Sequence, residues 1–99
     1  PRPGEHEVDK YGYNGFHRTR LTDLLVAHNV DTVLITGTVT QICVEDTARG
    51  AFHEGFQVAV VADAVACYEP DLTRASLQTL AMKYGRVLTA DEALREMNA

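Results

Sequence analysis

The side chain best suited to covalent chemistry in this sequence is the thiol of Cys43, which follows the apolar run DTVLITG at residues 31–37. A helical pattern begins directly after it. Cys43 is therefore expected in the first turn of a helix, where unpaired N–H groups and the helix dipole favour a thiolate, the nucleophilic form. The same N–H groups could hold an oxyanion. Since cysteine is also among the most buried residue types, core packing is an equally weighted alternative.

Lys10 is the second candidate, because it is one of only two lysines in the chain and precedes an aromatic, glycine-rich loop. A lysine beside a cysteine favours the thiolate and steadies an anionic intermediate. A single lysine is also often a solvated surface residue. Cys67 has no helix start at its own position, and we interpret it as a packing or lining residue. Asp63 ends an apolar run, where it is expected to orient a loop or cap a turn.

Three aromatic rings, those of Tyr11, Tyr13 and Phe16, fall within six residues of one loop. They either wall a pocket for a small planar substrate or anchor the loop onto the domain, and both interpretations stay open. The four histidines lack ligand spacing, and the two cysteines are too few for a disulfide framework. We therefore expect no metal and no cofactor.

Length and composition are typical of one small soluble domain, with 99 residues, 45% hydrophobic residues and a net charge of −5. The Lys and Arg residues form no cluster, so nucleic acid is not an expected partner. The longest apolar stretches are too short to span a bilayer, and no membrane partner is expected. No targeting segment is visible, which makes the cytoplasm the expected location.

Hydrophobic periodicity alternates between strand and helix patterns along the chain. The expected elements are a short edge strand at 5–10, a helix at 19–29, a strand at 31–37, a helix at 41–54, a strand at 57–64, a helix at 70–84, a strand at 86–89 and a helix ending at 97. This order predicts an α/β fold, a Rossmann-like three-layer α-β-α arrangement with a mainly parallel sheet. The run 31–37 lacks alternation, which predicts a strand buried on both faces. Ligands bind beyond the carboxyl ends of such strands, where Cys43 lies.

Several motifs occur together in a set order and spacing. They are K-x-x-Y-x-x-F-x-x-T-x-L from Lys10, G-x-x-T-x-x-C-V from Gly37, T-A-x-x-A from Thr47 and V-x-D-A from Val61. From about residue 4 to 92 the chain resembles the C-terminal half of the isochorismatase-like cysteine hydrolases. That superfamily includes isochorismatases, nicotinamidases, N-carbamoylsarcosine amidases and ureidoacrylate amidohydrolases. The resemblance implies that residues 1–99 form the C-terminal part of a single hydrolase domain.

The resemblance also implies a catalytic triad of Asp, Lys and Cys, with Cys43 as the nucleophile and Lys10 as the lysine. It implies a cis peptide bond between Thr38 and Val39, which aims the Val39 amide with that of Cys43 into an oxyanion hole. Tyr13 and Phe16 match loop positions near the active site of the family.

The triad Asp of the family lies in the first strand of its sheet, and no residue of this chain can be assigned to it. We therefore expect the chain to pack against an N-terminal half of the fold or against another subunit, as a homo-oligomer. An uncovered sheet edge favours such pairing.

The leading functional hypothesis is a cysteine-dependent hydrolase that cleaves a small amide or ureido compound through a thioester. One alternative is a non-catalytic binding or scaffold relative, or an inactive fragment. Another is an isochorismatase-type vinyl-ether hydrolase, which catalyses a reaction that some relatives perform without a cysteine. A nucleotide-binding function ranks low, because TGTVTQIC lacks the G-x-G-x-x-G spacing.

Overall fold

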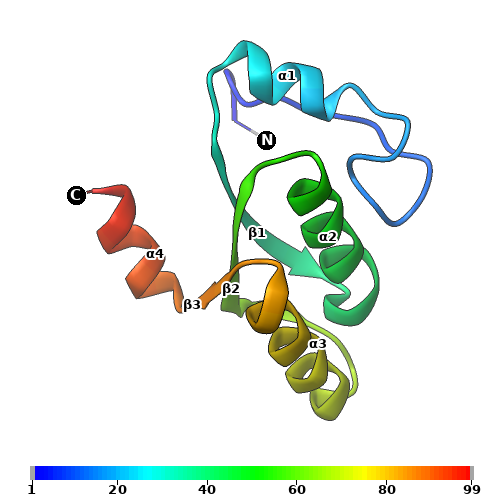
Figure 1. The fold of residues 1–99 in the computed structure, drawn as a ribbon, viewed down its shortest axis with the longest axis vertical. Coiled ribbons are helices and arrows are strands. Elements are labelled where there is room, and N and C mark those ends of the chain that lie inside the picture. Colours follow the sequence, from blue (N-terminus) through cyan, green and yellow to red (C-terminus); the bar gives the residue numbers. More distant parts are fainter. Residues whose placement is uncertain (1, 99) are drawn as a thin grey trace.

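Helices and strands alternate from residue 21 onward in the computed structural model, which describes residues 2–98 (Figure 1). The elements are α1 (Leu21–Ala27), β1 (Thr32–Thr38), the π-helical turn η1 (Thr40–Val44), α2 (Glu45–His53), β2 (Gln57–Ala66), α3 (Pro70–Lys83), β3 (Arg86–Leu88) and α4 (Ala90–Met97). The expected α/β fold is confirmed. None of the helices between residues 2 and 98 has the length and apolar content needed to cross a membrane.

The three strands form a parallel sheet in the order β1-β2-β3, with β2 in the centre. The register between β1 and β2 changes along the pair. Ile35 faces Val60, whereas Gly37, only two residues further along β1, faces Val65. Residues 61–64 of β2 therefore have no partner in β1, although Val61 still pairs with Leu88 of β3, and this bulge brings the end of β2 alongside the end of β1.

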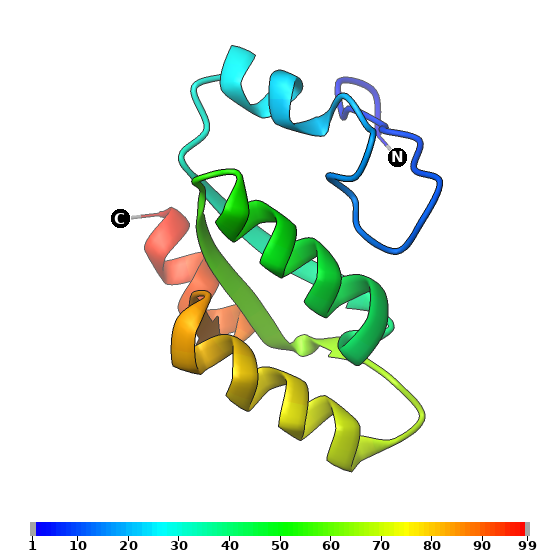
Figure 2. The same ribbon diagram turned by 45° about the vertical axis from the view of Figure 1, so that its right-hand side comes forward.

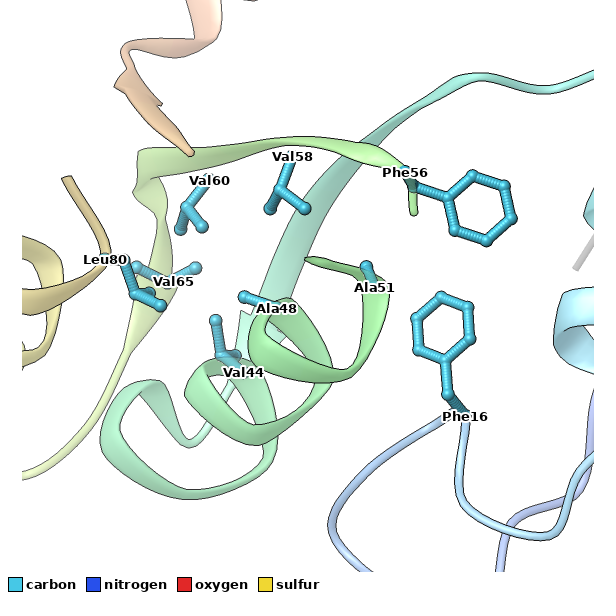
Figure 3. Close-up of a cluster of buried hydrophobic side chains, with 9 residues drawn as sticks. All are labelled: Phe16, Val44, Ala48, Ala51, Phe56, Val58, Val60, Val65 and Leu80. Carbon is cyan, nitrogen blue, oxygen red and sulfur yellow. The ribbon is translucent and has the colours of Figure 1, made fainter. Parts of the chain in front are cut away.

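Alternate residues of β2 serve two separate cores. Val58 and Val60 belong to the larger core, which α2 and α3 cover, whereas Ala59 and Val61 point to the opposite face and pack with α4. Figure 2 shows α2 and α3 on one side of the sheet and α4 on the other. Figure 3 shows the larger core. Its buried members are Phe16, Val44, Ala48, Ala51, Phe56, Val58, Val60, Val65 and Leu80.

The helix ends follow local sequence rules. At the end of α2, Gly55 adopts a φ of 93°, a conformation that glycine tolerates best, and the amide of Phe56 donates to the carbonyl of Ala51 at 3.0 Å. At the start of α4, Thr89 and Glu92 form a capping box, as the sequence T-A-D-E at 89–92 favours. The pKa of Glu92 is lowered first by the Thr89 amide, which donates to Glu92 Oε1 at 2.9 Å and favours the charged form, and then by the Thr89 side chain.

Two expectations about strands are wrong. Residues 5–10 form no strand, because no neighbouring strand lies beside them to pair with; Arg20 instead donates to the carbonyl of Glu7 at 2.7 Å. The strand β1 is not buried on both faces either. It lies at the edge of the described sheet, where α4 covers β2 and leaves Leu34 38% exposed. The strand buried on both faces is β2.

The turn between α3 and β3 generates a stability prediction. A Cβ added at Gly85 would lie 2.2 Å from the backbone oxygen of Val58, so Gly85→Ala forces backbone to move and is expected to lower the free energy of unfolding by about 1–3 kcal/mol. The matched control is Gly12→Ala, because a Cβ there meets nothing within 4 Å. Urea denaturation of both variants measures the effect. Equal stabilities of the two variants would contradict the packing described.

Candidate active site

The backbone turns sharply where β1 ends, and this turn carries the candidate nucleophile. The peptide bond between Thr38 and Val39 is cis, as the family resemblance implies. The carbonyl of Val39 then accepts hydrogen bonds from the amides of Ile42 and Val44, both at 3.1 Å, which starts η1. Cys43 lies on this turn and is half-buried. The helix predicted at 41–54 therefore begins as a π-helical turn and becomes regular only at Glu45.

The loop that carries Lys10 is docked on α2 by hydrogen bonds to one hydroxyl. Thr47 Oγ1 accepts from the amide of Gly15 at 2.9 Å and donates to the carbonyl of Tyr13 at 3.3 Å. Lys10 Nζ donates to the same Tyr13 carbonyl at 3.2 Å. The small residue Gly50 lets this loop approach α2 closely, because a Cβ there would lie within 3 Å of the side chain of Asn14.

Phe16 anchors this loop in the larger core. Phe16 is only 8% exposed, and its ring lies 5.9 Å from the ring of Phe56, centroid to centroid (Figure 3). The structure therefore assigns Phe16 the anchoring role that the sequence left open. Tyr11 and Tyr13 are exposed. Tyr13 lines a shallow hollow of about 370 Å³ over α2, together with Ile42.

The docked loop places Lys10 and Cys43 on the walls of one small hollow of about 130 Å³, called here the Cys43 hollow. Its lining residues are Lys10, Ile35, Thr36, Thr38, Cys43, Val44 and Thr47. Lys10 and Cys43 lie far apart in the chain, and their ammonium group and thiol thus share one cavity. This arrangement can position a carbonyl for attack by a thiolate and stabilise the negative charge that develops.

Asp63 and Cys67 both have structural hydrogen bonds. Asp63 accepts from the amide of Ala90 at 2.7 Å and so helps to cap α4, which confirms its expected capping role. Cys67 Sγ lies 3.0 Å from the hydroxyl of Thr73 and accepts from the amide of Glu69 at 3.3 Å. Cys67 also lines a hollow of about 300 Å³, as expected of a lining residue.

Sequence reasoning missed a polar network that joins the start of α2 to α3. Glu45 accepts a 2.5 Å hydrogen bond from the buried hydroxyl of Ser76 and pairs with Arg49 at 3.0 Å. Arg49 in turn donates to the hydroxyl of Tyr84 at 2.8 Å. Because Glu45 is two residues beyond Cys43, this network holds the turn that carries the thiol. The Glu45–Arg49 pair has the ordinary i,i+4 helix spacing, whereas the contacts with Ser76 and Tyr84 join distant parts of the chain and no local pattern reveals them.

Comparison with protein families identifies the chain. The Isochorismatase domain family matches residues 1–92, and the chain belongs to this family. Among solved structures, a cysteine hydrolase from Pseudomonas syringae pv. phaseolicola superposes with a TM-score of 0.95 at 36% sequence identity. That match covers 99% of this chain and 51% of the solved chain.

Two named relatives share this region. Nicotinamidase 3 of Arabidopsis thaliana is 36% identical over 90 residues, which are 91% of this chain and 46% of the relative. Maleamate amidohydrolase of Pseudomonas putida is 34% identical over 97 residues, covering 98% of this chain and 46% of the relative. The chain therefore spans about half the length of these relatives.

The two cysteines provide an internal test of the site. Cys43, at the start of the η1–α2 segment and beside Lys10, is expected to react with iodoacetamide at least about tenfold faster than Cys67 at neutral pH. Replacing the ammonium group in Lys10→Met should slow labelling of Cys43 and leave Cys67 unchanged. Peptide mapping by mass spectrometry measures both rates.

Lys83→Met is the matched control, since it removes the other lysine at an exposed position of α3. Equal labelling rates for Cys43 and Cys67 would favour the scaffold alternative, in which Cys43 is an ordinary packing residue.

Proposed function

We propose that this chain is the nucleophile-bearing half of a hydrolase that cleaves the C–N bond of a small amide or ureido compound. The observation that carries the proposal is the shared hollow of Lys10 and Cys43, next to the cis peptide bond at the end of β1. Membership in the Isochorismatase domain family supports it, as do the amide-hydrolysing relatives named above.

In the proposed reaction, a carboxylate base takes the proton of Cys43, and the thiolate attacks the carbonyl carbon of the amide. The tetrahedral intermediate expels ammonia or an amine, which takes up the proton, and a thioester remains on Cys43. Water then attacks the thioester, releases the acid and restores the thiol. No cofactor takes part in this proposal.

The charge on the carbonyl oxygen is greatest in the tetrahedral intermediate. We propose that the amides of Val39 and Cys43 hold this oxyanion, with Thr38 completing the turn, while the Lys10 ammonium group stabilises it. Tyr13 is proposed to border the bound substrate through the shallow hollow that it lines. Phe16 supports the site from the core by anchoring the Lys10 loop.

The carboxylate base is proposed to come from an N-terminal half of the fold, packed along the edge of β1. A second copy of the chain is the other proposed partner, as in a homo-oligomer. The exposed residues of β1, including Leu34 and Thr36, give such a partner a free edge to pair with. The proposed location of the protein is the cytoplasm.

Substitutions of Cys43 and Lys10 test the proposal in the intact protein. Cys43→Ser is expected to lower kcat by at least about a thousandfold, because an alkoxide is not generated at neutral pH as a thiolate is. Lys10→Met is expected to lower kcat by about 10²–10³-fold through loss of charge stabilisation. Ammonia release from nicotinamide and from small ureides measures the rates.

The control for Lys10→Met is again Lys83→Met, which should keep the parental rate. Urea denaturation confirms that the inactive variants remain folded. Turnover that survives in folded Cys43→Ser would remove Cys43 from the role of nucleophile.

A further inference from the structure

A second hollow lies beside the reactive turn, at the carboxyl ends of β1 and β2. It has a volume of about 300 Å³ and is called here the Cys67 hollow. It is lined by Thr38, Val39, Ala66, Cys67 and Tyr68. Thr38 and Ala66 face each other in the strand register, so this hollow sits where a parallel sheet of this kind places its ligands.

The Cys43 hollow is too small to hold a whole substrate. Its volume of about 130 Å³ falls below the roughly 300–1,000 Å³ of ordinary small-molecule sites. Thr38 lines both hollows, so they lie next to each other at this residue. A substrate whose carbonyl lies at Cys43 can therefore extend past Thr38 into the Cys67 hollow.

The side chains that line the Cys67 hollow are uncharged. Of its lining residues, Val39 and Ala66 are aliphatic, and the thiol of Cys67 already has polar partners in Glu69 and Thr73. Tyr68 is 99% exposed, so its ring is free to lie against a ligand. An aromatic ring of this kind suits a planar, uncharged group.

The start of α3, next to Cys67, carries no cationic side chain that could bind a substrate carboxylate. Pro70 has no N–H group, and the amides of Leu72 and Thr73 already donate to the carbonyl of Glu69 at 3.0 and 3.2 Å. Asp71, in the same turn, adds a negative charge. A substrate carboxylate therefore meets no cationic side chain among these groups, and the negative charge of Asp71 repels it.

We propose that the Cys67 hollow binds the uncharged body of the substrate, and that Cys67 and Tyr68 select neutral planar amides over amides that carry a carboxylate. This inference rests on the proposed hydrolase function. The named relatives show that the distinction matters, because nicotinamide is neutral whereas maleamate is an anion. Maleamide and maleamate form a matched pair of probes that differ only in an amide in place of a carboxylate.

The first experiment measures binding without turnover. In Cys43→Ser, Cys67 is the remaining thiol, and its labelling by iodoacetamide reports occupation of the hollow. Maleamide is expected to slow this labelling saturably, by at least about threefold, because a bound ligand buries the walls of its site. Maleamate at the same concentrations is expected to give little protection. Equal protection by both compounds, or protection by neither, would overturn the proposed subsite.

The second experiment measures selectivity in the active protein. The ratio of kcat/KM for maleamide to that for maleamate is expected to exceed about ten, and Tyr68→Arg should shift it at least about tenfold toward maleamate. Tyr68→Phe is the matched control and should keep the ratio. A ratio unchanged by Tyr68→Arg would contradict the subsite. Protection of Cys67 without hydrolysis of either compound would instead contradict the proposed hydrolase function and leave the subsite standing.

Discussion

One backbone carbonyl, that of Tyr13, connects the Lys10 ammonium group to α2, the helix that follows Cys43. It accepts a hydrogen bond from Lys10 Nζ and another from the hydroxyl of Thr47, which belongs to the helix that follows Cys43. The position of the ammonium group relative to the thiol therefore depends on how this loop sits on α2. The buried ring of Phe16 and the close approach at Gly50 hold the loop there. Without these contacts, Lys10 would belong to an exposed segment with no fixed relation to Cys43.

Much of this arrangement could be predicted from the sequence, because local rules decide it. The helix ends follow from residues that suit only a few backbone conformations, such as Gly55 and the Thr89–Glu92 capping box. The run 57–64 predicted a strand because β-branched residues cluster there, and β2 is the strand buried on both faces. The cis peptide bond between Thr38 and Val39 was predicted from the family resemblance, because no residue propensity indicates it.

The remaining features depend on contacts between distant parts of the chain. The bulge in β2 arises from its register with β1, and it is this bulge that brings Ala66 opposite Thr38. Residues 5–10 form no strand because no other strand lies beside them, and β1 is half-exposed because it lies at the edge of the described sheet. A strand pattern in the sequence shows where apolar residues recur, but it does not show which strand or helix lies beside them. The hydrogen bond from Ser76 to Glu45 joins two helices, so no local pattern predicts it.

The central claim is that Cys43 forms a covalent bond to the substrate carbonyl carbon. An aldehyde analogue of nicotinamide, labelled with ¹³C at the carbonyl carbon, tests this claim directly, because a thiolate converts it into a tetrahedral thiohemiacetal that NMR distinguishes from the free aldehyde and its hydrate. We expect the thiohemiacetal signal in the parental protein and in Cys67→Ala, and its loss in Cys43→Ala. A signal that persists in Cys43→Ala, or that never forms in the parental protein, would contradict the account.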